Sequence, residues 1–60
     1  MIRVAIVEDS KTIRESLSHF VQTDPECQCV FTCATAEEAL EVIPRQQHDI
    51  VLMDIQLPKL

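Results

Sequence analysis

The sequence predicts an α/β fold, a doubly wound parallel sheet in the order strand, helix, strand, helix, strand. Two four-residue runs, at 4–7 and 50–53, are apolar at every position. Such runs are typical of parallel strands that helices cover on both faces. Two amphipathic segments and one weaker strand pattern lie between these runs. This alternation of strands and helices favours a single parallel sheet over a sandwich or a helical bundle.

The first strand is expected at residues 2–7, and an amphipathic helix follows it. Ser10 is suited to the N-cap position, because its hydroxyl can accept a hydrogen bond from an amide of the first turn. Apolar residues then recur with the spacing of one helix face, at Ile13, Leu17, Phe20 and Val21. We expect this helix to end near Thr23, because Pro25 disfavours helical backbone at the residue before it.

The second strand is expected at residues 27–32, where the pattern is weaker. Cys27, Cys29 and Phe31 alternate with Gln28, Val30 and Thr32, which indicates a strand at an edge of the sheet.

The second helix is expected to open with a capping box formed by Thr35 and Glu38. Its apolar face consists of Ala36, Ala39, Leu40 and Ile43. Pro44 should end or kink this helix, because proline supplies no amide and clashes with the preceding turn. The third strand is then expected at 49–53, with a loop from 54 to 60.

The favoured strand order is 2-1-3, a partial flavodoxin-like sheet with the two helices on opposite faces. Right-handed crossovers, together with acidic residues after the first and third strands, place the first strand in the middle. Nothing would cover the outer edge of the third strand, and an open apolar edge promotes association. We therefore expect residues 1–60 to be an incomplete domain, either truncated or swapped with a second copy.

Length and composition exclude several classes of protein. Sixty residues with 47% hydrophobic content make one small globular domain. The formal net charge of -5 argues against a direct contact with nucleic acid. No apolar stretch has the length of a membrane span or the form of a signal peptide. The three cysteines have no framework spacing, which indicates a reducing, cytoplasmic location. The absence of glycine excludes the Gly-rich loops that bind nucleotides.

Three carboxylates carry the chemistry that the sequence predicts. Glu8 and Asp9 follow the first strand, and Asp54 follows the third. The carboxyl ends of neighbouring parallel strands meet at one edge of the sheet, where ligands bind. Because clustered carboxylates repel one another, a hard divalent cation with oxygen ligands is expected among them. Taken singly, each acid could equally be a helix cap or a solvated loop residue.

These segments together resemble the receiver domain of bacterial two-component response regulators. The residues that carry the resemblance are Val7 to Ser10, Glu37 to Leu40, and the run from Asp49 to Pro58. The similarity covers the whole chain but only about the N-terminal half of a usual receiver.

The resemblance implies that Asp54 is a phosphoacceptor that takes its phosphoryl group from a histidine kinase or a phosphotransfer domain. It further implies a Mg²⁺ site, with Asp9 as a direct ligand and Glu8 acting through water. Asp54 and the backbone carbonyl of Gln56 would complete the protein ligands of the metal. On this reading the chain is a signalling domain that assists its own phosphorylation and is not an enzyme acting on separate substrates.

The sequence departs from the family pattern where it stops. A whole receiver carries a later Ser or Thr and a later Lys that sense the phosphoryl group, and neither is present; Lys59 is not a substitute. Two other functions therefore stay open. One is a non-catalytic fragment that dimerises or docks through its open edge. The other is an aspartyl-phosphate hydrolase, which Gln56 disfavours because such enzymes usually carry a second Asp at that position.

Other residues that could carry chemistry are assigned simpler roles. The three cysteines, Cys27, Cys29 and Cys33, are expected to be small buried hydrophobes, because a zinc site needs four ligands and no histidine lies near them. His19 is expected to be solvated, and His48 is expected to lie in a turn. The polar side of the first helix is interpreted as either a docking surface for the kinase or a solvated face; it consists of Lys11, Arg14 and Ser18.

Overall fold

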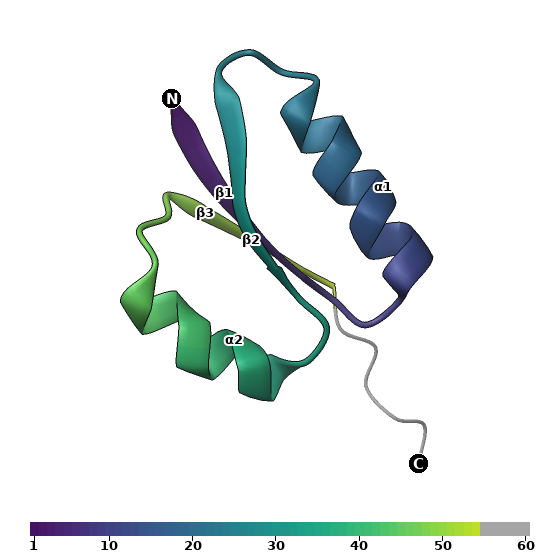
Figure 1. Ribbon diagram of the computed structural model, residues 1–60, viewed down its shortest axis with the longest axis vertical. Coiled ribbons are helices and arrows are strands. Elements are labelled where there is room, and N and C mark those ends of the chain that lie inside the picture. The colour runs from purple at the N-terminus through teal and green to yellow at the C-terminus, as the bar shows by residue number, and fades with distance from the viewer. Residues whose placement is uncertain (55–60) are drawn as a thin grey trace.

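The structure, a computed structural model, describes residues 1–54. Its elements follow the predicted alternation (Figure 1). They are β1 (Ile2–Glu8), α1 (Lys11–Gln22), β2 (Cys27–Cys33), α2 (Ala36–Val42), the short 3₁₀ helix η1 (Ile43–Arg45) and β3 (Ile50–Asp54).

The three strands form one parallel sheet in the order β2-β1-β3. This confirms the predicted strand order and the partial flavodoxin-like architecture. β1 is the central strand, and its middle residues are the most buried in the described chain: Ala5, Ile6 and Val7 have no exposed surface. A continuous apolar run at 4–7 is what a strand needs when both of its faces are covered.

Each face of β1 packs against a different helix. On one face Val4 and Ile6 pack with Val21 of α1, and on the other face Val7 packs with Ala39 of α2. Since successive side chains of a strand point to opposite faces, the two helices cover opposite faces of the sheet, as predicted.

A β-bulge in β2 changes which face its side chains occupy. Val4 pairs with Cys29 but Ala5 pairs with Phe31, so Val30 is an extra residue. Cys29 therefore packs on the α1 side and Phe31 on the α2 side. The single alternation expected for 27–32 is wrong in this respect, because an inserted residue shifts the pleat by one position.

Both helices begin at the predicted caps. The Ser10 hydroxyl accepts a hydrogen bond from the Ile13 amide at 3.4 Å, and the Thr35 hydroxyl accepts one from the Glu38 amide at 3.2 Å. At the end of α2 the chain tightens into η1, where Pro44 lies near the first position, which confirms that proline ends the α-helix.

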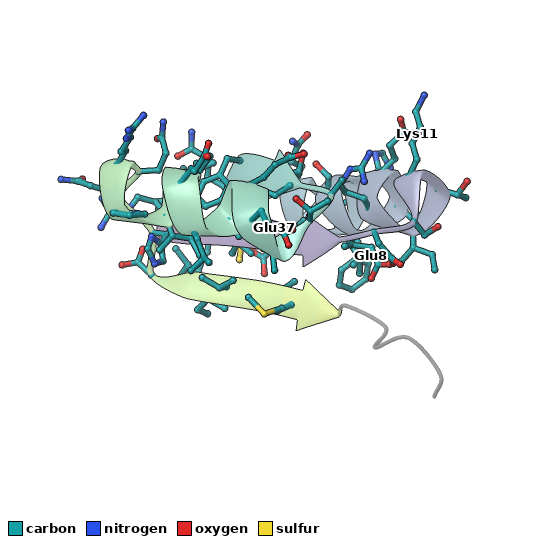
Figure 2. All side chains as sticks on the ribbon, turned by 90° about the horizontal axis from the view of Figure 1, so that it is seen from below. Glu8, Lys11 and Glu37 are labelled. Atoms are coloured by element: carbon teal, nitrogen blue, oxygen red, sulfur yellow. The ribbon has the colours of Figure 1, made fainter. Side chains whose placement is uncertain are left out.

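Four residues expected on the apolar helix faces are exposed: Ile13, Phe20, Ala36 and Leu40. Phe20 is 74% exposed and Leu40 is 76% exposed. β3 lies below both helices in Figure 2, and of its apolar residues only Val51 packs against a core cluster. Ile50 and Met53 on β3 are accordingly 46% and 57% exposed. The apolar pattern marked these residues for burial, but no described element lies over them.

Candidate functional site

The acidic site predicted from the sequence lies at the carboxyl ends of β1 and β3. Glu8 and Asp54 are the last residues of these two strands and are direct partners in the parallel register. The sequence had suggested that Asp54 begins the following loop, but it is the last residue of the strand. Asp9 follows Glu8 at once. The structure therefore brings the backbones of the predicted site residues together at one edge of the sheet. Gln56 and the side chain of Asp54 lie outside the described residues.

The turn after β1 holds Glu8 and Asp9 in different environments. Glu8 is buried, and its Oε1 accepts a hydrogen bond from the Ser10 amide at 3.1 Å. Asp9 is exposed to solvent. A carboxylate that is open to water can coordinate a cation directly, whereas a buried one that already accepts an amide has less freedom to do so. The two acids therefore differ in how freely their side chains can reach a cation.

Arg14 reaches the same turn from α1. Its Nη1 donates a hydrogen bond of 2.9 Å to the carbonyl oxygen of Glu8, so the guanidinium holds the end of β1 from the helix side. Sequence reasoning placed Arg14 on a docking or solvated face and missed this contact. The helical spacing was the available signal, because a long side chain in the first turns of α1 can reach back to the strand before it. Lys11 points away from the sheet (Figure 2).

The cysteines and histidines form no second site among residues 1–54. In that part of the chain no three His, Cys, Asp or Glu side chains form a group that could hold a metal. Burial raises the pKa of the Cys27 and Cys33 thiols, which disfavours the reactive thiolate. His48 packs edge-on against Phe31 with 6.5 Å between the ring centroids. His19 is exposed.

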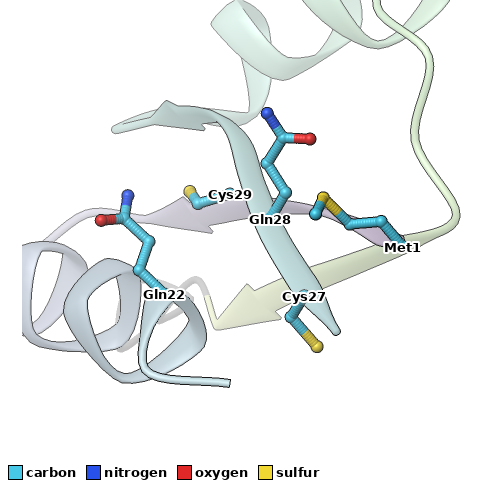
Figure 3. Close-up of a pocket in the computed structure, with 5 residues that line it drawn as sticks. All are labelled: Met1, Gln22, Cys27, Gln28 and Cys29. Carbon is cyan, nitrogen blue, oxygen red and sulfur yellow. The ribbon is translucent and has the colours of Figure 1, made fainter. Parts of the chain in front are cut away.

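A shallow pocket lies at the other end of the sheet (Figure 3). It is lined by Met1, Gln22, Cys27, Gln28 and Cys29. Met1 precedes β1, Gln22 ends α1, and the other three residues begin β2, so the pocket is remote from the acidic edge. Its lining contains no carboxylate and no cationic side chain, and it has no part in the site at Glu8 and Asp54.

The chain is similar in sequence to known response regulatory proteins and methylesterases. The chain is 43% identical over all 60 residues to the protein-glutamate methylesterase/protein-glutamine glutaminase 1 of Syntrophus aciditrophicus, of which it covers 17%. It is 38% identical, again over its whole length, to an uncharacterised response regulatory protein of Yersinia pestis, of which it covers 25%. The chain thus spans a quarter or less of the length of these curated relatives. No solved structure matches it.

A comparison of the chain with protein families points to the same kind of protein as these relatives do. The response regulator receiver domain matches residues 4–60, which is nearly the whole chain and includes Glu8, Asp9 and Asp54. The predicted resemblance is thereby confirmed, as is the α/β architecture that it implies. The chain belongs to the response regulator receiver domain family of two-component signalling.

Proposed function

We propose that this chain accepts a phosphoryl group on Asp54 from a phosphohistidine partner, with Mg²⁺ bound at the acidic edge. The observation that carries the proposal is the pairing of Glu8 with Asp54 at the last position of the β1–β3 register. That pairing brings two acidic residues from distant parts of the sequence to one edge, and Asp9 is next to them.

The residues at this edge fit a hard divalent cation. Asp9 would hold Mg²⁺ directly, Glu8 through water, and Asp54 with the carbonyl of Gln56 would complete the protein ligands. Mg²⁺ prefers oxygen donors and retains several waters. When bound, it would neutralise charge on the transferring phosphoryl group. The exposure of Asp9 and the burial of Glu8 support this division of roles.

Asp54 would supply the nucleophile. A carboxylate oxygen forms a bond to phosphorus as the bond from phosphorus to the donor imidazole nitrogen breaks, and the imidazole retains the electron pair. The resulting acyl phosphate carries about −1.5 to −2 charges near neutral pH, by analogy with other phosphoryl groups. Glu8 would keep the strand end in place through its bond to the Ser10 amide.

The proposed partner is a histidine kinase or a phosphotransfer domain in the cytoplasm. No helix within residues 1–54 combines the length and the apolar character that crossing a membrane requires. The methylesterase and glutaminase activities named for the relatives belong to much longer proteins. We propose that this chain corresponds to their receiver part and contributes phosphoryl acceptance, not ester or amide hydrolysis.

Substitution of the acids tests the phosphoacceptor assignment. Asp54→Asn should abolish labelling by an acyl-phosphate reagent, because the amide is a poor nucleophile, whereas Asp9→Ala should weaken Mg²⁺ binding and slow labelling. Asp24→Asn, which changes an exposed acid in the α1–β2 turn, is the matched control and should label fully. Full labelling of the Asp54→Asn protein, read by intact mass, would contradict the assignment.

The exposed apolar side chains of β3 favour a second candidate function, a non-catalytic module that dimerises or docks through the open edge. Ile50, Leu52 and Met53 are 46%, 38% and 57% exposed. Calorimetric titration with Mg²⁺ separates the two functions, since an interface module has no reason to bind the ion at millimolar concentration. Binding that disappears in Asp9→Ala favours the phosphoacceptor.

A further inference from the structure

Arg3, Gln47 and Asp49 form a polar clamp at the amino ends of β1 and β3. The Asp49 carboxylate accepts hydrogen bonds from the Arg3 amide at 2.8 Å, from Arg3 Nε at 3.2 Å and from Arg3 Nη2 at 3.3 Å. In return the Asp49 amide donates to the Arg3 carbonyl at 2.7 Å. Arg3 Nη1 donates to the Gln47 side-chain oxygen. Within this clamp, Asp49 therefore contacts both the backbone and the side chain of Arg3.

The clamp sets which residues of the two strands face each other. Asp49 bonds to Arg3, and the register then runs from the pair Val4 and Ile50 to the pair Glu8 and Asp54. Parallel strands rise by nearly the same distance per residue, so the pairing at one end determines the pairing at the other. A slip of one residue would move every β3 side chain to the opposite face of the sheet.

Packing alone constrains β3 weakly. β1 is the only described element with which β3 makes extensive contact, and among the apolar residues of β3 only Val51 packs against a core cluster. Ile50 and Met53 remain about half exposed. A strand without a well-buried face has a poorly specified register, so a directional polar contact is needed to select one.

The clamp is better suited to selecting a register than to adding stability. The side chains of Arg3 and Asp49 are 38% and 42% exposed, and ion pairs this open to water contribute little free energy. Their hydrogen bonds are nevertheless directional, and one of them uses a backbone amide. The Arg3 guanidinium also keeps the pKa of Asp49 below its ordinary value, so the carboxylate stays charged to a lower pH than an ordinary aspartate.

We propose that Arg3 and Asp49 are positioning residues, which hold β3 in the register that places Asp54 opposite Glu8. This inference rests on the proposed phosphoacceptor role of Asp54. It adds that residues at the far end of the sheet, which do not touch the phosphoryl group, determine how fast Asp54 is labelled.

Substitution of Asp49 tests the proposal with two readouts in the 60-residue chain. The first is the set of cross-strand proton contacts between β1 and β3 in NMR spectra, which report the register directly. The second is the rate at which Asp54 is labelled by an acyl-phosphate reagent at saturating Mg²⁺. Asp49→Ala should weaken the native β1–β3 contacts but keep those between β1 and β2. Its labelling rate should fall by roughly tenfold, the effect expected when the side-chain hydrogen bonds that favour one register are lost.

A conservative variant and a variant remote from the clamp distinguish a loss of β3 register from a general loss of structure. Asp49→Asn keeps an oxygen that can accept a hydrogen bond from the Arg3 amide, so it should retain the native β1–β3 contacts. Its labelling rate should stay within about threefold of the wild-type rate. The loss of one hydrogen bond of this kind should lower that rate by roughly tenfold. Arg45→Ala removes an exposed charge from η1 and should behave as wild type. Native β1–β3 contacts together with wild-type labelling in Asp49→Ala would overturn the proposal, and so would slow labelling with unchanged contacts.

The test still decides the proposal if Asp49→Ala does not fold or if the wild-type chain is not labelled. If Asp49→Ala does not fold, Asp49→Ser replaces it, because serine keeps only a weaker acceptor. A full set of native contacts and a full labelling rate in that variant would overturn the clamp. If wild type itself is not labelled, the proposed function fails, and the NMR contacts alone decide whether the clamp sets the register.

Discussion

At the scale of single residues, the acidic edge depends on contacts that hold the turn after β1. Arg14 donates to the Glu8 carbonyl, and Ser10 donates its amide to the Glu8 side chain. Both contacts fix the backbone on either side of Asp9. Asp9, the proposed ligand, is exposed, so its position is defined only if its flanking backbone is held. The hydrogen bonds from Arg14 and from the Ser10 amide therefore support the proposed site, although neither group would touch the metal.

Arg14→Ala should weaken Mg²⁺ binding while leaving the fold intact. Loss of residues that orient metal ligands typically costs about 10-fold to 100-fold in affinity, and we expect the lower end because the Ser10 contact remains. Calorimetric titration measures the affinity, and far-ultraviolet circular dichroism monitors the fold. Arg14→Lys should recover part of the loss, because an ammonium group can also donate to a carbonyl. An unchanged affinity in Arg14→Ala would show that the turn holds its shape without the guanidinium.

At the scale of elements, local chemistry at the helix ends agrees with the overall architecture. Ser10 and Thr35 each accept a hydrogen bond from an amide three residues later. The acidic residues Glu37 and Glu38 lie in the first turn of α2, where they interact favourably with the helix dipole. α2 is only seven residues long, and a helix this short is marginal without such caps and its packing.

Thr35→Ala should lower the free energy of unfolding by about 1 kcal/mol, the usual effect of removing a helix cap. The matched control is Thr12→Ala, which changes an exposed threonine inside α1 and should alter stability by less than about 0.5 kcal/mol. Urea denaturation followed by circular dichroism measures both values. Equal effects of the two substitutions would show that the cap at Thr35 is unimportant.

At the scale of the whole molecule, two thin apolar clusters share one strand. Val4 and Ile6 face α1, and Val7 faces α2. Because both clusters depend on β1, damage to this strand removes support from both layers at once. The outer strand β3 contributes much less, since most of its apolar surface is exposed.

Ile6→Ala should come close to unfolding the chain. Removing a fully buried isoleucine side chain typically costs about 2–5 kcal/mol, whereas a domain of this size is stable by only about 3–9 kcal/mol. Leu40→Ala removes a comparable side chain that is 76% exposed and should change stability by less than about 0.5 kcal/mol. Thermal denaturation of both variants provides the comparison. A similar melting temperature for Ile6→Ala and wild type would show that β1 is not the shared core.

Much of this arrangement follows from the sequence by itself. Local chemistry or chain connectivity determines the strand order, the two helix caps, the end of α2 just before Pro44 and the acidic pair at the end of the first strand. Apolar runs, capping side chains and proline act over a few residues, and the handedness of parallel crossovers then restricts the topology.

Only the tertiary structure decided the contacts that join distant segments. The bulge at Val30 places Phe31 on the α2 side, Arg14 reaches the Glu8 carbonyl, and Asp49 clamps Arg3 across 46 positions of sequence. It also showed that Phe20 and Leu40 are exposed, although the apolar pattern had marked them for the core. A periodic pattern records which side chains could be buried, but burial depends on whether another element lies over them. Register and side-chain reach are likewise properties of two segments together, and neither segment alone contains them.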